Sequence, residues 1–350
     1  MAPRIEMQVE VEQLPLRAPL RISGYTFTTF PAILVTLRAG GFVGRGEAAG
    51  VYYHGETADG MRRQVEAVRA EIEAGIDRQG LLTLLPRGGA RNAVDCALWD
   101  LEAQRDGCSV AELAGLGRAR ALRTTFTLGA DDPAAVAAGA VAYVEARAVK
   151  LKLAGDGLDA ERVRAARAAR PDVWLGVDAN RGFSRASLAA LMPVLIEARV
   201  QLIEQPFPIG RDADLDGVAS PIAIAADESL QGLEDLDRLV GRVDVANIKL
   251  DKCGGLTEGL AMALRARQLG LTPMVGCMAG TSLAMAPAWI LGQLCAYVDL
   301  DGPIWLARDR SPRACYADGQ IFCPGELWGG GSAERRSRTA SQVLDHTLSN

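Results

Sequence analysis

Histidine is almost absent from this chain: among 350 residues there are two, His54 and His346. A histidine-rich zinc site, or a general base built on imidazole, therefore has almost no raw material. The Walker A sequence, a G-x-G-x-x-G after a strand and the G-x-S-x-G elbow are also missing. Acid–base chemistry in this protein would have to use lysine, aspartate, glutamate or tyrosine.

Other absences limit the partners and the compartment. No stretch approaches 18 uninterrupted apolar residues, and the first six residues do not resemble a signal peptide. The net charge of −5 favours neither nucleic acid nor an anionic membrane as a partner. The seven cysteines form no C-x-x-C pair, which is typical of a reduced protein. We therefore expect a cytoplasmic protein with no nucleic-acid or membrane partner.

The segment 148–153 alternates apolar and cationic residues, so a strand there places Lys150 and Lys152 on one face. An edge strand with solvated lysines is one explanation. However, helical patterns lie on both sides, from Asp132 to Ala146 and from Leu158 to Ala169. A strand between two helices is normally a parallel strand that is covered on both faces. Two buried lysines would then need counter-charges.

The first 120 residues have an α+β pattern. We expect a strand over residues 4–13, an antiparallel pair over 32–37 and 43–48, and helices over 57–74 and 90–104. Pro15 to Thr29, which has few helix signals, is expected to be a loop.

From Thr124 onward, short strands alternate with helices. The expected strands span residues 124–128, 148–153, 174–178, 201–204, 222–227, 245–248, 272–276 and 296–299. Eight strands with seven helices between them predict a (β/α)7β TIM-like barrel over residues 121–304. An open doubly wound sheet is the alternative, but it would need a phosphate loop or switch-point signature that is not present. After residue 305 the pattern is irregular, and the polar end after Gly329-Gly330-Gly331 is expected to be disordered.

Polar residues stand at the ends of successive apolar strands: Lys152, Asp178, Glu204, Asp227 and Lys249. Active sites of such barrels lie at these ends. The three acids come from neighbouring strands, and three carboxylates without histidine suit Mg²⁺, with Mn²⁺ as a possible substitute.

The two lysines come from strands 2 and 6, which stand opposite each other in a ring of eight. A carbon held between Lys152 and Lys249 could lose a proton to one and gain a proton from the other. Such an arrangement would invert a stereocentre α to a carboxylate through a metal-stabilised enediolate. Lys150 and the dication would lower the pKa of the base by about 3 units, which requires roughly 4 kcal/mol. We expect Lys150 itself to be an electrostatic helper and a ligand of the substrate carboxylate.

Several motifs resemble the muconate-lactonising subgroup of the enolase superfamily. They are Lys150-x-Lys152, Asp178-Ala179-Asn180, Glu204-Gln205-Pro206, Asp227-Glu228-Ser229 and Asn247-Ile248-Lys249-Leu250-x-Lys252-x-Gly254-Gly255. Residues 44–48 and 91–101 resemble its capping domain. The resemblance implies a Lys base with Mg²⁺, residues 1–120 as a capping domain, residues 305–350 returning to that domain, and Asn180 and Glu228 supporting the metal ligands.

Within the subgroup, Asp299-Leu300-Asp301 is similar to the D-x-D of dipeptide epimerases. Two carboxylates opposite the metal would suit the α-ammonium of a dipeptide, although a solvated turn would also explain them. Tyr25 stands where Ala-Glu epimerases carry arginine, so we expect an apolar or small substrate side chain rather than an acidic one. Subgroup members tend to carry glutamate at the position of Gly280.

Two further residues are candidates for substrate contact. Tyr53 lies in a possible specificity loop over residues 51–57, and packing of aromatic residues on the barrel rim is an equal alternative. Thr127 on the first barrel strand could contact the substrate or have a purely structural role.

The leading hypothesis is a homo-oligomeric, Mg²⁺-dependent isomerase that epimerises a dipeptide at the C-terminal α-carbon. N-acylamino acid racemisation and β-elimination by a lyase of dehydratase or cycloisomerase type are alternatives on the same site. A non-catalytic relic of the fold and a Schiff-base aldolase remain conceivable.

Overall fold

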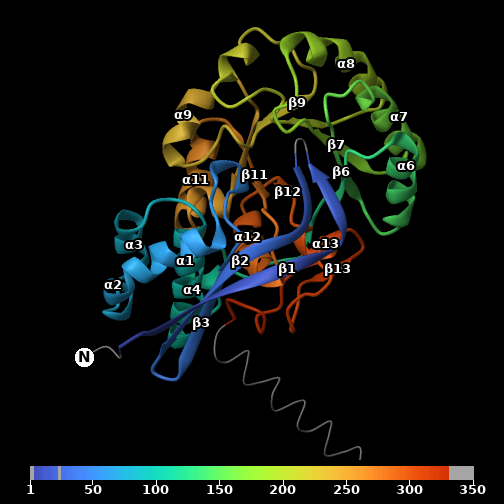
Figure 1. Cartoon of the computed structure of the whole chain (residues 1–350). Helices are drawn as coiled ribbons and strands as arrows, with labels where there is room; N and C mark the ends of the chain where they lie inside the picture. Colours follow the sequence, from blue (N-terminus) through green and yellow to red (C-terminus); the bar gives the residue numbers. More distant parts are fainter. Residues whose placement is uncertain (1–3, 23–24, 331–350) are drawn as a thin grey trace, which may run out of the picture.

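A computed structural model describes residues 4–22 and 25–330 (Figure 1). The chain begins with an antiparallel sheet of three strands, β1 (Glu6–Ile22), β2 (Tyr25–Ala39) and β3 (Phe42–Ala48), in that spatial order. The expected loop at Pro15–Thr29 is wrong, because β1 and β2 continue through it as a long hairpin. The ladder is interrupted only between Pro15 and Leu20, where two prolines remove donors.

The hairpin is stabilised by contacts with residues far away in the sequence, which its own sequence does not predict. Its apolar face joins a cluster that includes Leu14, Phe30 and Leu306. The Ala307 amide also donates to the Pro15 carbonyl at 2.8 Å. In Figure 1 the hairpin extends from the N-terminal sheet toward the barrel, and Leu16, Leu20 and Phe27 line the same cavity as residues at the barrel strand ends. It therefore brings N-terminal residues to the mouth of the barrel.

Helices cover one face of the N-terminal sheet. They are the 3-10 helix η1 (Tyr52–His54), α1 (Ala58–Ala67), α2 (Arg69–Glu73), α3 (Arg78–Leu84), α4 (Gly89–Asp106) and α5 (Val110–Leu113). The run expected as one helix over 57–74 is divided at Val68. β3 packs closely on α4, since a Cβ at Gly44 or Gly46 would collide with the α4 backbone.

Eight parallel strands follow in one sheet whose spatial order equals the chain order. They are β5 (Phe126–Leu128), β6 (Ala148–Lys152), β7 (Trp174–Asp178), β8 (Leu202–Glu204), β9 (Ala223–Ala226), β10 (Val245–Lys249), β11 (Thr272–Gly276) and β12 (Tyr297–Val298). The Thr125 amide donates to the Val298 carbonyl at 3.0 Å, so the first and last strands meet. The expected TIM-like barrel is confirmed.

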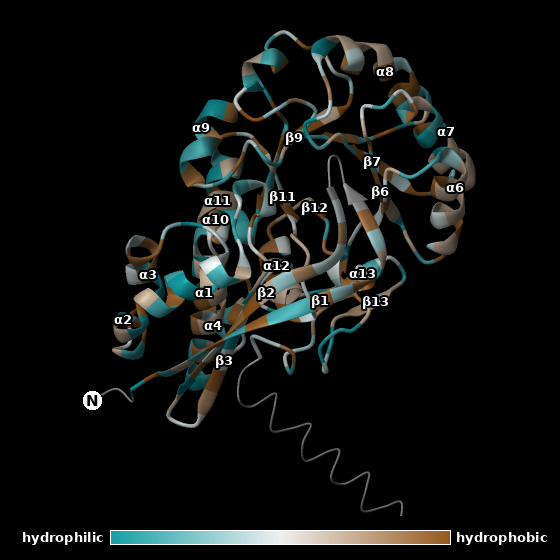
Figure 2. Cartoon of the chain, in the orientation of Figure 1, coloured by the Kyte–Doolittle hydropathy of each residue, from teal (hydrophilic) through white to brown (hydrophobic). Residues whose placement is uncertain are grey.

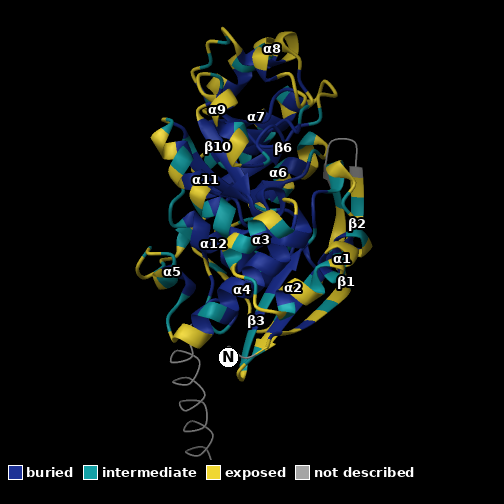
Figure 3. Cartoon of the chain, turned by 90° about the vertical axis from the view of Figure 1, so that its left-hand side faces the viewer, coloured by how far each residue is buried: buried dark blue, intermediate teal, exposed yellow. Residues whose placement is uncertain are grey.

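The connections between these strands supply the outer layer. They contain α6 (Pro133–Ala142), α7 (Asp159–Ala169), α8 (Arg185–Glu197), η2 (Asp212–Leu215), η3 (Leu233–Asp235), α9 (Leu236–Leu239), α10 (Leu250–Cys253), α11 (Leu256–Gln268) and α12 (Ser282–Gly292), and α13 (Gly302–Trp305) follows β12. Figure 2 shows hydrophilic residues on α7 and α9, and Figure 3 shows exposed helical residues around buried strands. The strands are covered on both faces, as parallel strands usually are.

After the barrel the chain returns to the N-terminal part. β13 (Cys315–Ala317) and β14 (Gln320–Phe322) form a small sheet with β4 (Leu122–Arg123). Trp328 then donates to the Arg45 carbonyl at 2.8 Å, and the Gly329 amide donates to Asp100 at 2.9 Å. The tail expected to be disordered lies outside the described residues. Within the described ranges, no helix has the length and apolarity needed to cross a membrane.

Candidate active site

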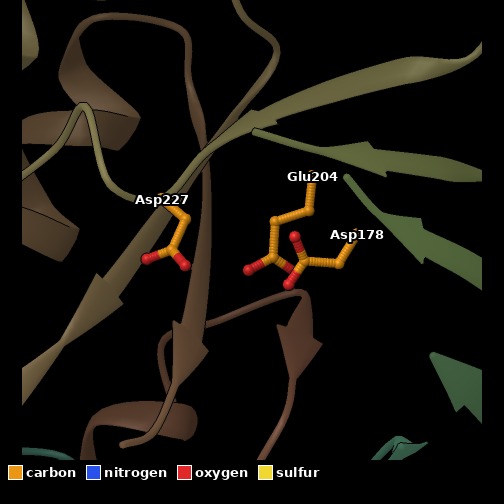
Figure 4. A group of neighbouring side chains, drawn as sticks. All are labelled: Asp178, Glu204 and Asp227. Carbon is orange, nitrogen blue, oxygen red and sulfur yellow. The ribbon is translucent and has the colours of Figure 1, made fainter. Parts of the chain in front are cut away.

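The strand ends bring three acids together, as the spacing predicts. Asp178 ends β7, Glu204 ends β8, and Asp227 directly follows β9. One carboxylate oxygen from each lies within 4.8 Å of the others, and all three side chains are buried (Figure 4). Parallel pairing produces this convergence because Asp178 stands opposite Glu204 in the ladder. We refer to these three residues as the acid triad.

The acid triad fits a hard divalent cation. Glu204 Oε1 accepts a hydrogen bond from Asn247 at 2.8 Å, whereas Glu204 Oε2 is buried without a hydrogen bond. Burial, followed by the charge of Asp178, raises the pKa of Glu204 to about 8. Such a cluster is costly without a positive charge at its centre. An all-oxygen donor set is the kind that Mg²⁺ prefers.

Asp227 is held by two lysines, one of which the sequence reasoning left without a role. Lys249 Nζ and Lys252 Nζ lie 2.7 and 2.6 Å from different oxygens of its carboxylate. Lys252 is fully buried and also reaches the Asn247 carbonyl. Burial would raise the pKa of Asp227, but the two ammonium groups outweigh it and lower that pKa. The signal for Lys252 was its place in the Asn247–Gly255 motif.

Lys152 and Lys249 lie on opposite sides of the barrel. They end β6 and β10, which are four strands apart in the closed ring of eight. Lys152 Nζ donates to Asp178 at 2.6 Å, while Lys249 binds Asp227. Each amine therefore touches a member of the acid triad from its own side.

The carboxylates beside Lys249 favour its charged form. Burial would lower the pKa of Lys249, but Asp227 and Glu204 outweigh burial and hold that pKa well above its ordinary value. The expected lowering of the pKa of the base rests on Lys150 and on a bound dication, so it stays a prediction. A cation on the triad oxygens would compete with the lysines for the same negative charge.

Lys150 connects the acid triad to the acids that follow β12. Its amine forms an ion pair with Asp299 and lies 3.5 Å from Glu204 and 3.9 Å from Asp178. Burial opposes the charged form, but these three acids raise the pKa of Lys150 well above its ordinary value. Lys150 is therefore a buried cation rather than a solvated edge lysine.

Asp299 and Asp301 are both buried, which excludes a solvated turn. Asp299 accepts hydrogen bonds from Thr125 and Lys150, and Asp301 accepts one from the Thr127 amide at 2.6 Å. Burial and the neighbouring Asp299 raise the pKa of Asp301 to about 6. Thr127 thus serves the site at least by positioning Asp301.

Asn180 and Glu228 lie beside the acid triad. The Asn180 amide donates to Asp178 at 2.9 Å, and its side chain donates to Glu228 at 3.4 Å. Burial and the charge of Asp227 raise the pKa of Glu228 to about 7. Arg181 lies 3.2 Å from Glu228, and its guanidinium lies over the Tyr53 ring at 5.2 Å. This arginine was not singled out from the sequence.

A cavity of about 260 Å³ opens above these residues. Its roof is a set that we call the capping wall: Leu16, Leu20, Phe27, Phe30 and Tyr52. Tyr53 also lines the cavity, and its hydroxyl accepts from Gln231 at 3.3 Å. The Tyr25 side chain lies outside the described part of the chain. Tyr52 lies in the expected specificity loop over residues 51–57, whereas the hairpin residues Leu16, Leu20 and Phe30 of the wall were not singled out from the sequence.

Buried hydrogen bonds fix the roof against the barrel. Asp251, two residues after Lys249, accepts from the Gly50 amide at 2.8 Å. Glu47 accepts from the Thr281 amide at 2.7 Å. At Gly280 a Cβ would lie 2.7 Å from Ala284 and 3.4 Å from Glu47, so the glutamate expected from the subgroup would require a shift of its neighbours.

Comparison with known proteins places this geometry in a family. Residues 134–310 match the model for the enolase C-terminal domain-like family, and residues 4–115 match that for the mandelate racemase / muconate lactonizing enzyme N-terminal domain. The chain is 38% identical over 317 residues to an L-Ala-D/L-Glu epimerase of Escherichia coli K12, covering 90% of this chain and 98% of that protein.

Solved structures agree with this placement. An enolase family member from Agrobacterium tumefaciens with homology to dipeptide epimerases, with bound sodium and L-Ala-L-Glu, has a TM-score of 0.89 and 40% identity, covering 93% of this chain and 100% of that one. The dipeptide epimerase of Methylococcus capsulatus, complexed with Mg and L-Arg-D-Lys, has a TM-score of 0.86 and 32% identity, covering 93% and 98%. The chain therefore belongs to the mandelate racemase and muconate lactonizing enzyme family of the enolase superfamily, as an isomerase of the epimerase and racemase type.

Proposed function

We propose that this protein is a dipeptide epimerase that inverts the α-carbon of the C-terminal residue by proton transfer between Lys152 and Lys249. The observation that carries the proposal is the position of two buried amines on opposite strands, with the acid triad on the strands between them. An α-carbon held between the amines presents one face to each. Removal of its proton by one amine and return from the other reverses its configuration.

Asp178, Glu204 and Asp227 would hold Mg²⁺, with Mn²⁺ as a substitute, and relatives with similar structures are complexed with Mg. When bound, the cation supplies an electrophile for the substrate carboxylate and stabilises negative charge at the deprotonated α-carbon. Asn180 and Glu228 would support this site through their contacts with Asp178 and with each other.

The lysines exchange protonation states during turnover. The amine that abstracts the proton must be neutral, while the opposite amine is an ammonium ion and donates its proton to the other face of the carbon. After one turnover the two states are interchanged, so the enzyme is ready for the reverse reaction. Lys150 would contribute a fixed positive charge next to the substrate carboxylate.

Asp301 favours a dipeptide over an N-acylated amino acid. It lies on the side of the barrel opposite β8, and its Oδ2 is held by the Thr127 amide. A buried carboxylate there would bind the α-ammonium of the substrate, assisted by Asp299. An N-acylated amino acid has no such charge. Contacts of Thr127, Tyr25 and Tyr53 with the substrate belong to the proposal.

The test is a library of L,L-dipeptides incubated in D₂O with the enzyme and Mg²⁺. Epimerisation replaces the C-terminal α-hydrogen with deuterium and adds one mass unit. Exchange with no dipeptide, combined with loss of water from a hydroxy acid, would instead support the β-elimination alternative. Borohydride trapping with substrate would reveal a Schiff-base aldolase.

A cytoplasmic location and a homo-oligomeric assembly are parts of the same proposal. All seven cysteines are free thiols, which supports a reducing compartment. Sedimentation or light scattering of the purified protein would measure the oligomeric state.

A further inference from the structure

The capping wall consists of aliphatic and aromatic side chains that pack against one another. The Phe27 and Phe30 rings are stacked with centroids 4.7 Å apart, and the edge of Tyr52 meets Phe27 at 5.2 Å. Leu20 is the ladder partner of Phe27, so both face the same side of the hairpin. The wall is thus one continuous apolar surface over the cavity.

The barrel determines which part of the substrate meets this wall. A deprotonated α-carbon is planar, and its two faces point at Lys152 and Lys249. Its three substituents lie in the plane between those lysines, about 120° apart. The carboxylate is directed to the acid triad and the peptide nitrogen to the side of Asp301. The third substituent, the side chain of the C-terminal residue, points away from the barrel strands and toward the capping wall.

We propose that the side chain of the epimerised residue is apolar, and that Phe27, which stacks on Phe30 and packs in a T-shaped contact with Tyr52, is the residue that selects it. This inference rests on the proposed dipeptide epimerase function and names its substrate class. In the described part of the chain, the cations that line the cavity are Lys150, Lys152 and Lys249, each bound to an acid of the site. Arg181 is paired with Glu228. Among the described residues, a glutamate side chain on the substrate would therefore meet no cation on the wall itself.

The direct test compares L-Ala-L-Phe, L-Ala-L-Leu and L-Ala-L-Glu as substrates of the wild-type enzyme in D₂O with Mg²⁺. We expect kcat/KM for the phenylalanine and leucine dipeptides to exceed that for the glutamate dipeptide by at least 100-fold, about 2.7 kcal/mol in transition-state stabilisation. Calorimetric titration supplies a second measurement: L-Ala-L-Phe should bind with the larger negative heat capacity change.

A variant pair tests the role of Phe27. Phe27→Arg should raise the ratio of kcat/KM for L-Ala-L-Glu to that for L-Ala-L-Phe by at least 100-fold, while Phe27→Leu should retain the wild-type preference. Equal or better use of L-Ala-L-Glu by the wild type would overturn the inference and leave the epimerase function intact. Exchange with none of the dipeptides would overturn both. The wild-type comparison decides the matter even if Phe27→Arg does not fold.

Discussion

Replacing Lys249 with alanine should separate proton exchange from epimerisation. The variant removes one of the two amines that face the α-carbon, so inversion of configuration should stop in both directions. A positioned acid or base contributes about 10²–10⁴-fold to a rate. We expect the epimerisation kcat/KM to fall by about 10³-fold or more, equivalent to roughly 4 kcal/mol.

The structure indicates that this loss will not come from collapse of the metal site. Without Lys249, Asp227 keeps its contact with Lys252 Nζ at 2.6 Å. Lys152 and Asp178, on the far side, keep their hydrogen bond at 2.6 Å. The variant should therefore fold, bind Mg²⁺, and still exchange the α-proton of the epimer whose proton faces Lys152.

The assay follows the α-proton by NMR in D₂O, starting separately from L-Ala-L-Phe and L-Ala-D-Phe. Lys249→Ala should label one of them without inversion, and Lys152→Ala should label the other. Lys252→Met is a control for the loss of a buried amine beside Asp227. It should lower the free energy of unfolding by about 3–5 kcal/mol. If both lysine variants exchanged the same epimer, or if either epimerised within tenfold of wild type, the two-lysine arrangement would be refuted.

Three further predictions concern metal binding, backbone conformation and pH. Asp178→Asn should weaken Mg²⁺ binding at least tenfold in calorimetric titration; unchanged affinity would exclude the acid triad as the metal site. Gly255→Ala should lower Tm more than Gly157→Ala, because a Cβ at Gly255 collides with Asp95 whereas that at Gly157 meets nothing, although both have positive φ; equal losses in scanning calorimetry would contradict this. Burial raises the pKa of Asp251 from 3.8 to about 7, so the folded state binds more protons than the unfolded state between these pH values. The free energy of unfolding should therefore fall by on the order of 4 kcal/mol as the pH rises through this range. Denaturant unfolding at pH 4 and pH 8 should show a smaller decrease for Asp251→Asn than for wild type.

The barrel could be predicted from the sequence because its signals are local. Each strand is a short apolar run between helical segments, and each catalytic candidate ends such a run. Because consecutive strands are neighbours in the barrel, the spacing of residues along the sequence predicts which side chains lie close together. For that reason Asp178, Glu204 and Asp227 could be brought together before any coordinates were known.

The hairpin that carries Leu16, Leu20, Phe27 and Phe30 of the capping wall could not be predicted in the same way. Pro15 and Pro19 interrupt the strand pattern, and the segment contains few helix signals, so it was expected to be a loop. Its strands are stabilised by contacts nearly 300 residues away, such as Ala307 with Pro15 and Leu306 with Arg17. The charged form that Lys249 adopts beside Asp227 and Glu204 could not be predicted either, because only the fold places these carboxylates against it.

The barrel and the N-terminal part of the chain thus have different roles in the site, and buried hydrogen bonds hold them together. The groups that would move the proton stand on barrel strands, and their partners are other barrel residues. Phe27, by contrast, packs on Phe30 and Tyr52. Contacts such as Asp251 with Gly50 hold the roof in place against the barrel. Substitutions at Phe27 should therefore change which dipeptide is selected while the proton still passes between the same two amines.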